Sequence, residues 1–273
     1  GWIERIGKVE PTQLHNHMPT VTLWRSALPV SKQMTTLRID LETYSDVDLK
    51  KCGVHKYVES DNFEVLLFAY AFDDEAVEVI DFASGEKLPY WLLLKLYDPE
   101  VTKTAYNAAF EIACLNRILD ANLVREQWRC TSVHALYLGL PGSLGDVGKV
   151  LGLSSDKQKM TAGWSLIKYF CVPCKPTLKN GGRTRNLCQH DPDKWQLFKE
   201  YCARDVDSER EIAVKIARFP VPDKEWKLWH LDQRMMNKGV MVDRELVNAA
   251  IECDNIFKER LSFFLKKKWY VTH

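Results

Sequence analysis

Residues 63–72 constrain the fold most, because this segment is almost wholly apolar and has the length of one strand. A strand that is apolar on both sides lies inside a sheet that other elements cover on both faces. The segment ends at the acidic triplet Asp73-Asp74-Glu75, and no stretch of the sequence approaches the roughly 18 apolar residues of a membrane-spanning helix. The sequence therefore predicts a protein built around a covered central sheet, with no membrane partner.

Further strands and helices are indicated on both sides of this segment by apolar residues at period two or at helical spacing. We expect strands at residues 36–41, 76–82 and 101–106, and helices at residues 89–97, 107–121, 131–138, 143–151, 156–170, 192–218, 223–238 and 244–268. Strands that come first, followed by mixed and then helical segments, indicate an α/β fold: a mixed sheet flanked by helices, with a helical C-terminal extension. Trp164, Trp195, Trp226 and Trp229 fall on these helices, and we expect them to pack in the core or between domains.

The pattern divides the chain into three segments. Residues 1–33 show no period and contain Pro11, Pro19 and Pro29, so we interpret them as a leader or extension of uncertain order. Residues 34–220 hold the sheet and most of the helices, and residues 221–273 are helical. A chain of 273 residues is long enough for one large domain and a fragment of a second.

Charge and cysteine usage narrow the choice of partner and compartment. The net charge is +1, so a nucleic acid would have to meet a local basic patch. Most of the eight cysteines sit singly, but Cys171, Cys174 and Cys188 could ligate zinc together with His190. Pro173 within the first pair and the short Cys-x-His spacing argue against zinc, and we expect reduced thiols in a cytoplasmic protein.

Asp40 and Glu42 stand two residues apart at the end of the first expected strand. Side chains at this spacing point to the same face of a strand. A divalent cation between them would relieve their repulsion, and the ligand sites of open sheets gather at the carboxyl ends of strands. The alternative is a solvated strand end whose acids bind nothing.

Two helices supply further candidates. Tyr201 and Asp205 share one helix face, where Asp205 could be a third metal ligand and Tyr201 could hold a water molecule. The alternative is a surface helix. Glu111 lies four residues after Asn107, and these two suit a helix N-cap and the positive end of the helix dipole. The functional interpretation makes Glu111 a fourth acid and Asn107 a substrate contact.

Three segments of the sequence together carry a family resemblance. They read Ile39-Asp40-Leu41-Glu42-Thr43, Asn107-Ala108-Ala109-Phe110-Glu111 and Tyr201-Cys202-Ala203-Arg204-Asp205. In this order they resemble the motifs of the DEDDy 3′→5′ exonucleases, and more narrowly the proofreading domain of family A DNA polymerases of phage or prophage type. The resemblance covers residues 35–242. It implies a ribonuclease H-like exonuclease domain over residues 34–220 and the helical start of a polymerase region over residues 221–273, in a bacterial or phage-infected cell.

The resemblance also implies two divalent cations, Mg²⁺ or Mn²⁺, which suit an all-oxygen ligand set. In it, Asp40 bridges both ions, Glu42 and Asp205 complete the first site, and Glu111 serves the second through water. Tyr201 and Glu42 orient the attacking water, and the products are nucleoside 5′-monophosphates. Bacterial members usually carry Asp where this chain has Glu111, so direct ligation of the second ion is in doubt.

The implied substrate is a single-stranded or frayed 3′ end of DNA, which such proteins meet by stacking and backbone contacts. The candidate contacts are Thr43, Asn107, Phe110, Arg183 and Arg185. The alternative for the two arginines is a solvated Gly-rich loop. No polymerase carboxylates follow the matched region, so we expect no polymerase activity from this chain alone and a polymerase domain as its partner.

Two other functions stay open at the level of sequence. One is an RNase D-like RNA exonuclease, which a tyrosine at position 201 permits. The other is a non-catalytic DNA-binding scaffold of a polymerase, which the intact set of acids disfavours.

Overall fold

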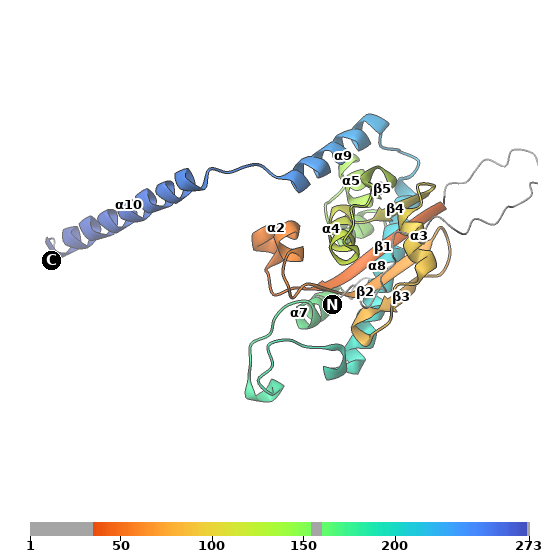
Figure 1. Ribbon diagram of the computed structural model, residues 1–273, viewed down its shortest axis with the longest axis horizontal. Coiled ribbons are helices and arrows are strands. Elements are labelled where there is room, and N and C mark those ends of the chain that lie inside the picture. The colour runs from red at the N-terminus through yellow and green to blue at the C-terminus, as the bar shows by residue number, and fades with distance from the viewer. Residues whose placement is uncertain (1–34, 154–159, 272–273) are drawn as a thin grey trace, which may run out of the picture. The chain divides into compact units, whose positions relative to one another are not determined.

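The computed structural model describes residues 35–153 and 160–271, and its centre is a mixed five-stranded sheet (Figure 1). The strands are β1 (Thr35–Tyr44), β2 (Glu64–Phe72), β3 (Glu78–Asp81), β4 (Val101–Ala105) and β5 (Trp128–Cys130). Their order is β3-β2-β1-β4-β5. The pairs β1–β2 and β2–β3 are antiparallel, whereas β1–β4 and β4–β5 are parallel.

Helices follow or separate these strands. They are α2 (Leu49–Val58), α3 (Tyr90–Tyr97), α4 (Ala108–Leu119), α5 (Thr131–Tyr137), α6 (Leu144–Val150), α7 (Met160–Phe170), α8 (Pro192–Ile216), α9 (Asp223–Lys238) and α10 (Arg244–Val271). Short 3-10 turns lie at Phe82–Ser84, Arg125–Gln127, Leu178–Asn180 and Cys188–His190. The expected helices are present, although the beginning of the one expected at residues 156–170 lies outside the described residues.

Two elements, α2 and β5, were not expected from the sequence. α2 begins after Asp48, whose side chain accepts a hydrogen bond from the backbone N–H of Lys50. Gly53 interrupts it with a φ of 75°, a conformation that glycine adopts readily. Within α2 only Tyr57 and Val58 are buried, so the segment lacks an apolar stripe that would predict a helix.

The core lies on both faces of the sheet. Leu37, Ile39 and Leu41 of β1 pack with α2, α3 and α4 on one face. On the other face, Ala69 and Ala71 of β2 pack with α7 and α8. The central strand β2 is thus covered on both sides, as its composition predicts. The expected α/β class, a mixed sheet flanked by helices with a helical C-terminal region, is confirmed.

The chain divides into two compact units after Gln233, inside α9. The first half of α9 belongs to the first unit because His230 is buried there, with its Nε2 atom 3.2 Å from the backbone oxygen of Trp128. The domain boundary expected between residues 220 and 221 stays a prediction. None of the described helices is both long and apolar enough to cross a membrane.

Candidate active site

The carboxyl end of β1 carries Asp40 and Glu42 beyond its parallel neighbour. The pairing of β1 with β4 ends at Arg38, and the chain then passes from β4 into α4. Glu111 lies in the first turn of α4 and is only 4% exposed. Because parallel strands end at the same edge of a sheet, the fold brings these two segments together.

A β-bulge follows Glu42. The register of β1 on β2 shifts between Glu42 and Thr43, which pair with Leu67 and Val65, so that Leu66 has no opposite residue. Bulges bend a strand and are frequent beside active sites, where they re-aim side chains. Here both Glu42 and Thr43 are buried.

Helix α8 brings Tyr201 and Asp205 to the same place. Its residue Cys202 is fully buried, and the thiol sulfur lies 3.5 Å from Oδ2 of Asp40. Asp205 lies one turn further along α8 than Tyr201, close enough that its charge raises the pKa of the Tyr201 phenol, after burial. The structure therefore gathers Asp40, Tyr201 and Asp205 where α8 packs on β1.

The negative charges of neighbouring acids, together with burial, raise the pKa of three carboxyl groups in the site. Burial, followed by repulsion from Asp205, raises the pKa of Asp40 well above its ordinary value. Burial, followed by repulsion from Asp40 and Asp205, raises the pKa of Glu42 in the same way. Burial and then Asp40 raise the pKa of Glu111. The carboxylates thus share one poorly solvated region in which a positive charge would stabilise the ionised form of each.

One oxygen of this set lacks a partner. Oε2 of Glu111 is buried and makes no hydrogen bond among the described residues. A buried polar atom in this state is unfavourable unless a ligand satisfies it. In the part of the chain that the structure describes, no three His, Cys, Asp or Glu side chains stand close enough together to hold a metal ion as they lie. The side chains of the site therefore converge, but as they lie they do not form a complete set of metal ligands.

A cavity of about 460 Å³ opens beside Glu42. Its apolar lining includes Leu41, Tyr57, Phe110, Trp164, Ile167 and Val172. Trp164 is 57% exposed, which corrects the expectation that it packs in the core or between domains, whereas Trp195 is buried as expected. The ammonium group of Lys50 lies 4.6 Å from the centroid of the Trp164 ring. This cavity can receive a flat, partly apolar group next to the acids.

Two of the predicted substrate contacts line this cavity, namely Thr43 and Phe110. Both contact Tyr57: Oγ1 of Thr43 lies 2.8 Å from its hydroxyl, and the Phe110 ring centroid lies 6.1 Å from its ring centroid. Asn107 stands exposed at the N-cap of α4, where its side chain makes no capping hydrogen bond. The Asn107 side chain therefore does not cap the helix.

The two predicted arginine contacts are held within the protein. Arg185 donates a 2.7 Å hydrogen bond to Glu64, and its guanidinium carbon lies 3.7 Å from the Tyr44 ring centroid. Nε of Arg183 donates a 2.8 Å hydrogen bond to Oδ1 of Asn186. Neither arginine lines the cavity beside Glu42. Their contact with DNA phosphates stays a prediction.

A buried ion pair that was not anticipated from the sequence stands next to the acids. Nη1 of Arg38 lies 2.8 Å from Oε2 of Glu209, and the two side chains are 12% and 3% exposed. The Thr131 hydroxyl also donates to Glu209. Arg38 comes two residues before Asp40 on β1, and Glu209 comes four residues after Asp205 on α8. The same spacing that singled out the acids could have found this pair.

The residues considered for zinc do not come together among the described residues. The Cys171 thiol lies 3.8 Å from Oε2 of Glu42, whereas the Cys188 thiol lies 3.6 Å from the backbone oxygen of Ala83. Nδ1 of His190 accepts a backbone hydrogen bond within its own turn. The geometry does not support a zinc site, and all eight cysteines are free thiols.

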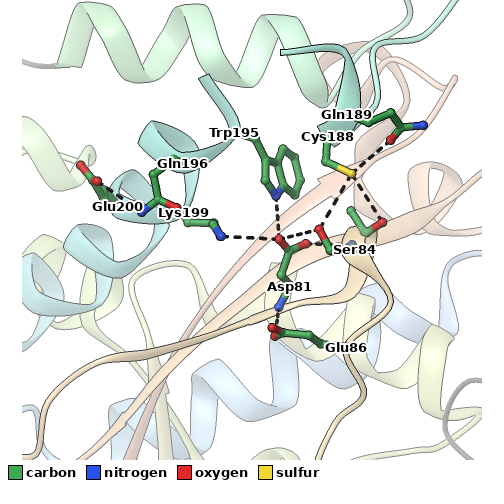
Figure 2. A network of polar contacts seen from close by, with 10 residues as sticks. Asp81, Ser84, Glu86, Cys188, Gln189, Trp195, Gln196, Lys199 and Glu200 are labelled. Atoms are coloured by element: carbon green, nitrogen blue, oxygen red, sulfur yellow. Dashed lines mark hydrogen bonds and ion pairs between the residues drawn. The ribbon is translucent and has the colours of Figure 1, made fainter. Parts of the chain in front are cut away.

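Cys188 belongs instead to a polar network around Asp81 (Figure 2). Asp81 is buried and accepts a 2.7 Å hydrogen bond from Nε1 of Trp195 and a 2.8 Å hydrogen bond from the Ser84 hydroxyl. These contacts tie the end of β3 to the start of α8. They support the helix that carries Tyr201 two turns further on.

A phage DNA polymerase is related to this chain in sequence. The chain is 52% identical over 234 residues to a DNA polymerase of Bacillus phage SP02. It is a homologue of that DNA polymerase. The match covers 86% of this chain and 36% of the phage protein, so this chain spans little more than a third of the length of its relative. The expected relationship to a phage DNA polymerase is confirmed. No family model matches the chain.

Several solved structures resemble this chain at low sequence identity. One, described as the apo form of a nuclease, is 16% identical with a TM-score of 0.42 and covers 77% of this chain and 89% of its own. Brucella melitensis NrnC with bound Mg²⁺ is 16% identical with a TM-score of 0.35, covering 71% and 93%. Escherichia coli RNase D, an exoribonuclease, is 17% identical with a TM-score of 0.36, covering 73% and 45%. These TM-scores are too low to bear on the function of this chain.

Proposed function

We propose that this chain is the proofreading 3′→5′ exonuclease part of a DNA polymerase, and that it hydrolyses the last phosphodiester bond of a single-stranded or frayed DNA 3′ end. The convergence of Asp40, Glu42 and Glu111 on the α8 segment that holds Tyr201 and Asp205 supports this most. The relationship to a phage DNA polymerase makes DNA the expected substrate. The product is a nucleoside 5′-monophosphate.

The residues of the site fit hard divalent cations. Carboxylate oxygens are the ligands that Mg²⁺ and Mn²⁺ prefer, and the unpartnered Oε2 of Glu111 would gain a partner. Two ions would be held by Asp40, Glu42, Glu111 and Asp205, and these side chains would have to draw closer together than they now stand. Ions bound there would supply an activated water molecule and neutralise charge on the scissile phosphate.

Tyr201 is suited to orient the attacking water. Burial, followed by the negative charges of Asp205 and Glu42, raises the pKa of its phenol, so the hydroxyl keeps its proton at neutral pH. A protonated phenol can donate one hydrogen bond and accept another, which allows it to contact both Asp205 and a water molecule. Glu42 stands beside it and can accept a proton from that water in its ionised form.

The cavity beside Glu42 is where we place the terminal nucleoside. Phe110 and Trp164 line it and present aromatic rings on which a base can stack. Stacking of this kind tolerates every base, because each base has an aromatic face. An exonuclease that removes any terminal nucleotide requires a pocket without base-specific contacts.

The direct test uses a 5′-labelled single-stranded DNA oligonucleotide with Mg²⁺ or Mn²⁺. The purified protein should shorten it stepwise from the 3′ end, and EDTA should stop the reaction. Asp40→Ala should lower the rate at least about a hundredfold, the loss typical of removing a preorganised electrostatic group. Asp74→Ala, which alters an exposed acid outside the site, is the matched control and should keep the wild-type rate.

The same assay separates the alternative functions. RNA of the same sequence degraded faster than DNA would favour an RNA exonuclease. DNA that is bound but never shortened, with either cation, would contradict the proposal and favour a non-catalytic scaffold.

A further inference from the structure

A glycine of α7 lies against the ring of Tyr201. Gly163 is buried, and it precedes the buried residues Leu166 and Phe170 on the side of α7 that packs on α8. A Cβ atom at Gly163 would lie 2.3 Å from Cε2, 2.8 Å from Cδ2 and 3.0 Å from Cζ of Tyr201. Non-bonded carbon atoms sit at about 3.5–4.0 Å, so no residue with a side chain fits while the ring keeps its place.

The ring has little freedom to retreat from such a contact. It stacks on Phe198, with ring centroids 6.3 Å apart and planes inclined by 10°. Phe198 is fully buried and stacks in turn on Phe170 at 5.4 Å. The far end of the ring carries the hydroxyl toward Asp205, one helical turn away on α8.

Gly163 lies inside helix α7, where alanine would ordinarily be the more stabilising residue. Glycine inside a helix is destabilising relative to alanine, because it has more backbone freedom to lose on folding. Its backbone here has no positive φ that would require glycine. The close approach of the Tyr201 ring is the feature of the structure that requires the absence of a side chain.

We propose that Gly163 is a positioning residue for Tyr201: it leaves the space that seats the phenol ring and so sets the place of the hydroxyl beside Asp205. The inference rests on the proposed function, in which that hydroxyl orients the attacking water. A methyl group at position 163 would displace the ring, and with it the hydroxyl, from its place beside Asp205. Gly163 itself touches no substrate.

The test is a set of double-variant cycles read by thermal unfolding and by steady-state kinetics. Gly163→Ala should lower the unfolding temperature by about 3 °C or more, as overpacking does in a close-packed core. In a Tyr201→Ala background the ring is gone, and Gly163→Ala should instead raise the unfolding temperature by about 2 °C through its better helix propensity. This reversal of sign needs no catalytic activity, so it tests the contact even if the proposed function fails.

Kinetics separate positioning from general packing. Gly163→Ala should lower kcat for DNA about as much as Tyr201→Phe does, with KM changed less than twofold. In a Tyr201→Phe background the ring still clashes but carries no hydroxyl, so Gly163→Ala should lower the unfolding temperature and cause no further loss of kcat. Gly142→Ala is the control, since a Cβ there meets open space.

Several outcomes would overturn the proposal. Gly163→Ala with wild-type kcat and wild-type unfolding temperature would do so, as would an equal loss of kcat in the Tyr201→Phe background. Should Gly163→Ala not fold, recovery of a folded protein on adding Tyr201→Ala supports the contact. A double variant that stays unfolded, when Tyr201→Ala alone folds, contradicts it.

Discussion

The Arg38 guanidinium donates a 2.8 Å hydrogen bond to the Glu209 carboxylate, and this contact joins β1 to α8 beside the cluster of acids. It places a positive charge beside the carboxylates of the site. Repulsion from Glu209 is among the causes that raise the pKa of Asp40 and of Glu111, after burial. The pair therefore offsets the charge of Glu209, and under the proposed function the remaining acids would be matched by bound cations.

Breaking this pair should be costly. Arg38→Leu leaves a buried carboxylate without its cation and should lower the free energy of unfolding by about 3 kcal/mol, whereas Arg38→Leu with Glu209→Leu should recover most of that loss. Urea unfolding in EDTA measures both. The exposed pair of Lys56 and Glu59 is the matched control, because Lys56→Leu should change stability by less than about 1 kcal/mol. Equal effects of Arg38→Leu and Lys56→Leu would contradict the structural role of the buried pair.

Because of these acids, the free energy of unfolding should fall with rising pH in the absence of cations and rise with pH in their presence. In the metal-free protein, Asp40, Glu42 and Glu111 have folded-state pKa values above those of the unfolded chain. Between the two sets of values the folded state binds more protons, so stability should fall as pH rises above about 4. With saturating Mg²⁺ the folded state binds the ionised carboxylates, and stability should rise with pH over the same range.

Thermal unfolding from pH 4 to pH 8, in EDTA and in Mg²⁺, checks this prediction. Asp40→Asn should flatten both slopes, because it removes one titrating group and relieves its neighbours of one charge. Stability that rises with pH in EDTA would show that the acids are not held in an unfavourable ionised state.

Most strands and most helices could be predicted from the sequence because each carries its own apolar pattern. β2 is the clearest case, since its composition alone indicates burial on both faces. β5 could not be found, because three residues are too few to show a period. α2 could not be found either, since Gly53 breaks it and only its last residues are buried.

The candidate site was predictable only in part. The spacing of the acids and of Tyr201 could be read from the sequence, but contacts between distant residues could not. Arg185 pairs with Glu64, which lies 121 positions away, and this competes with the predicted phosphate contact. Trp164 was expected in the core or between domains and lines the cavity instead, because its helix turns Gly163, and not Trp164, toward α8.

The cavity should control substrate affinity more than the chemical step. Trp164→Ala and Phe110→Ala each remove a stacking surface, and each should raise KM for single-stranded DNA about tenfold, in line with the ~1–3 kcal/mol of base stacking. Steady-state kinetics with kcat and KM resolved measures this. The control Trp91→Ala alters another half-exposed tryptophan, on α3, and should leave KM unchanged. An unchanged KM in both cavity variants would place the terminal base elsewhere.

Tyr201→Phe should slow hydrolysis without weakening cation binding. The substitution keeps the ring and its packing on Phe198 and removes only the hydroxyl that we place against the attacking water. We expect kcat to fall by about ten- to a hundredfold, within the range of loss of a positioned hydrogen-bond donor. The Mn²⁺ dissociation constant should stay within twofold of the wild-type value, and a larger shift would mean that the hydroxyl serves the ligand set.

The central claim is that Asp40, Glu42, Glu111 and Asp205 close around hard cations, and Mn²⁺ binding tests it most directly. Electron paramagnetic resonance counts free and bound Mn²⁺ in titrations of the wild-type protein, Asp40→Asn and Asp74→Asn. We predict that the wild-type protein and Asp74→Asn bind Mn²⁺ alike, and that Asp40→Asn loses this binding. Wild-type protein that binds no Mn²⁺, or an Asp40→Asn variant that binds it as well as the wild-type protein does, would contradict the claim.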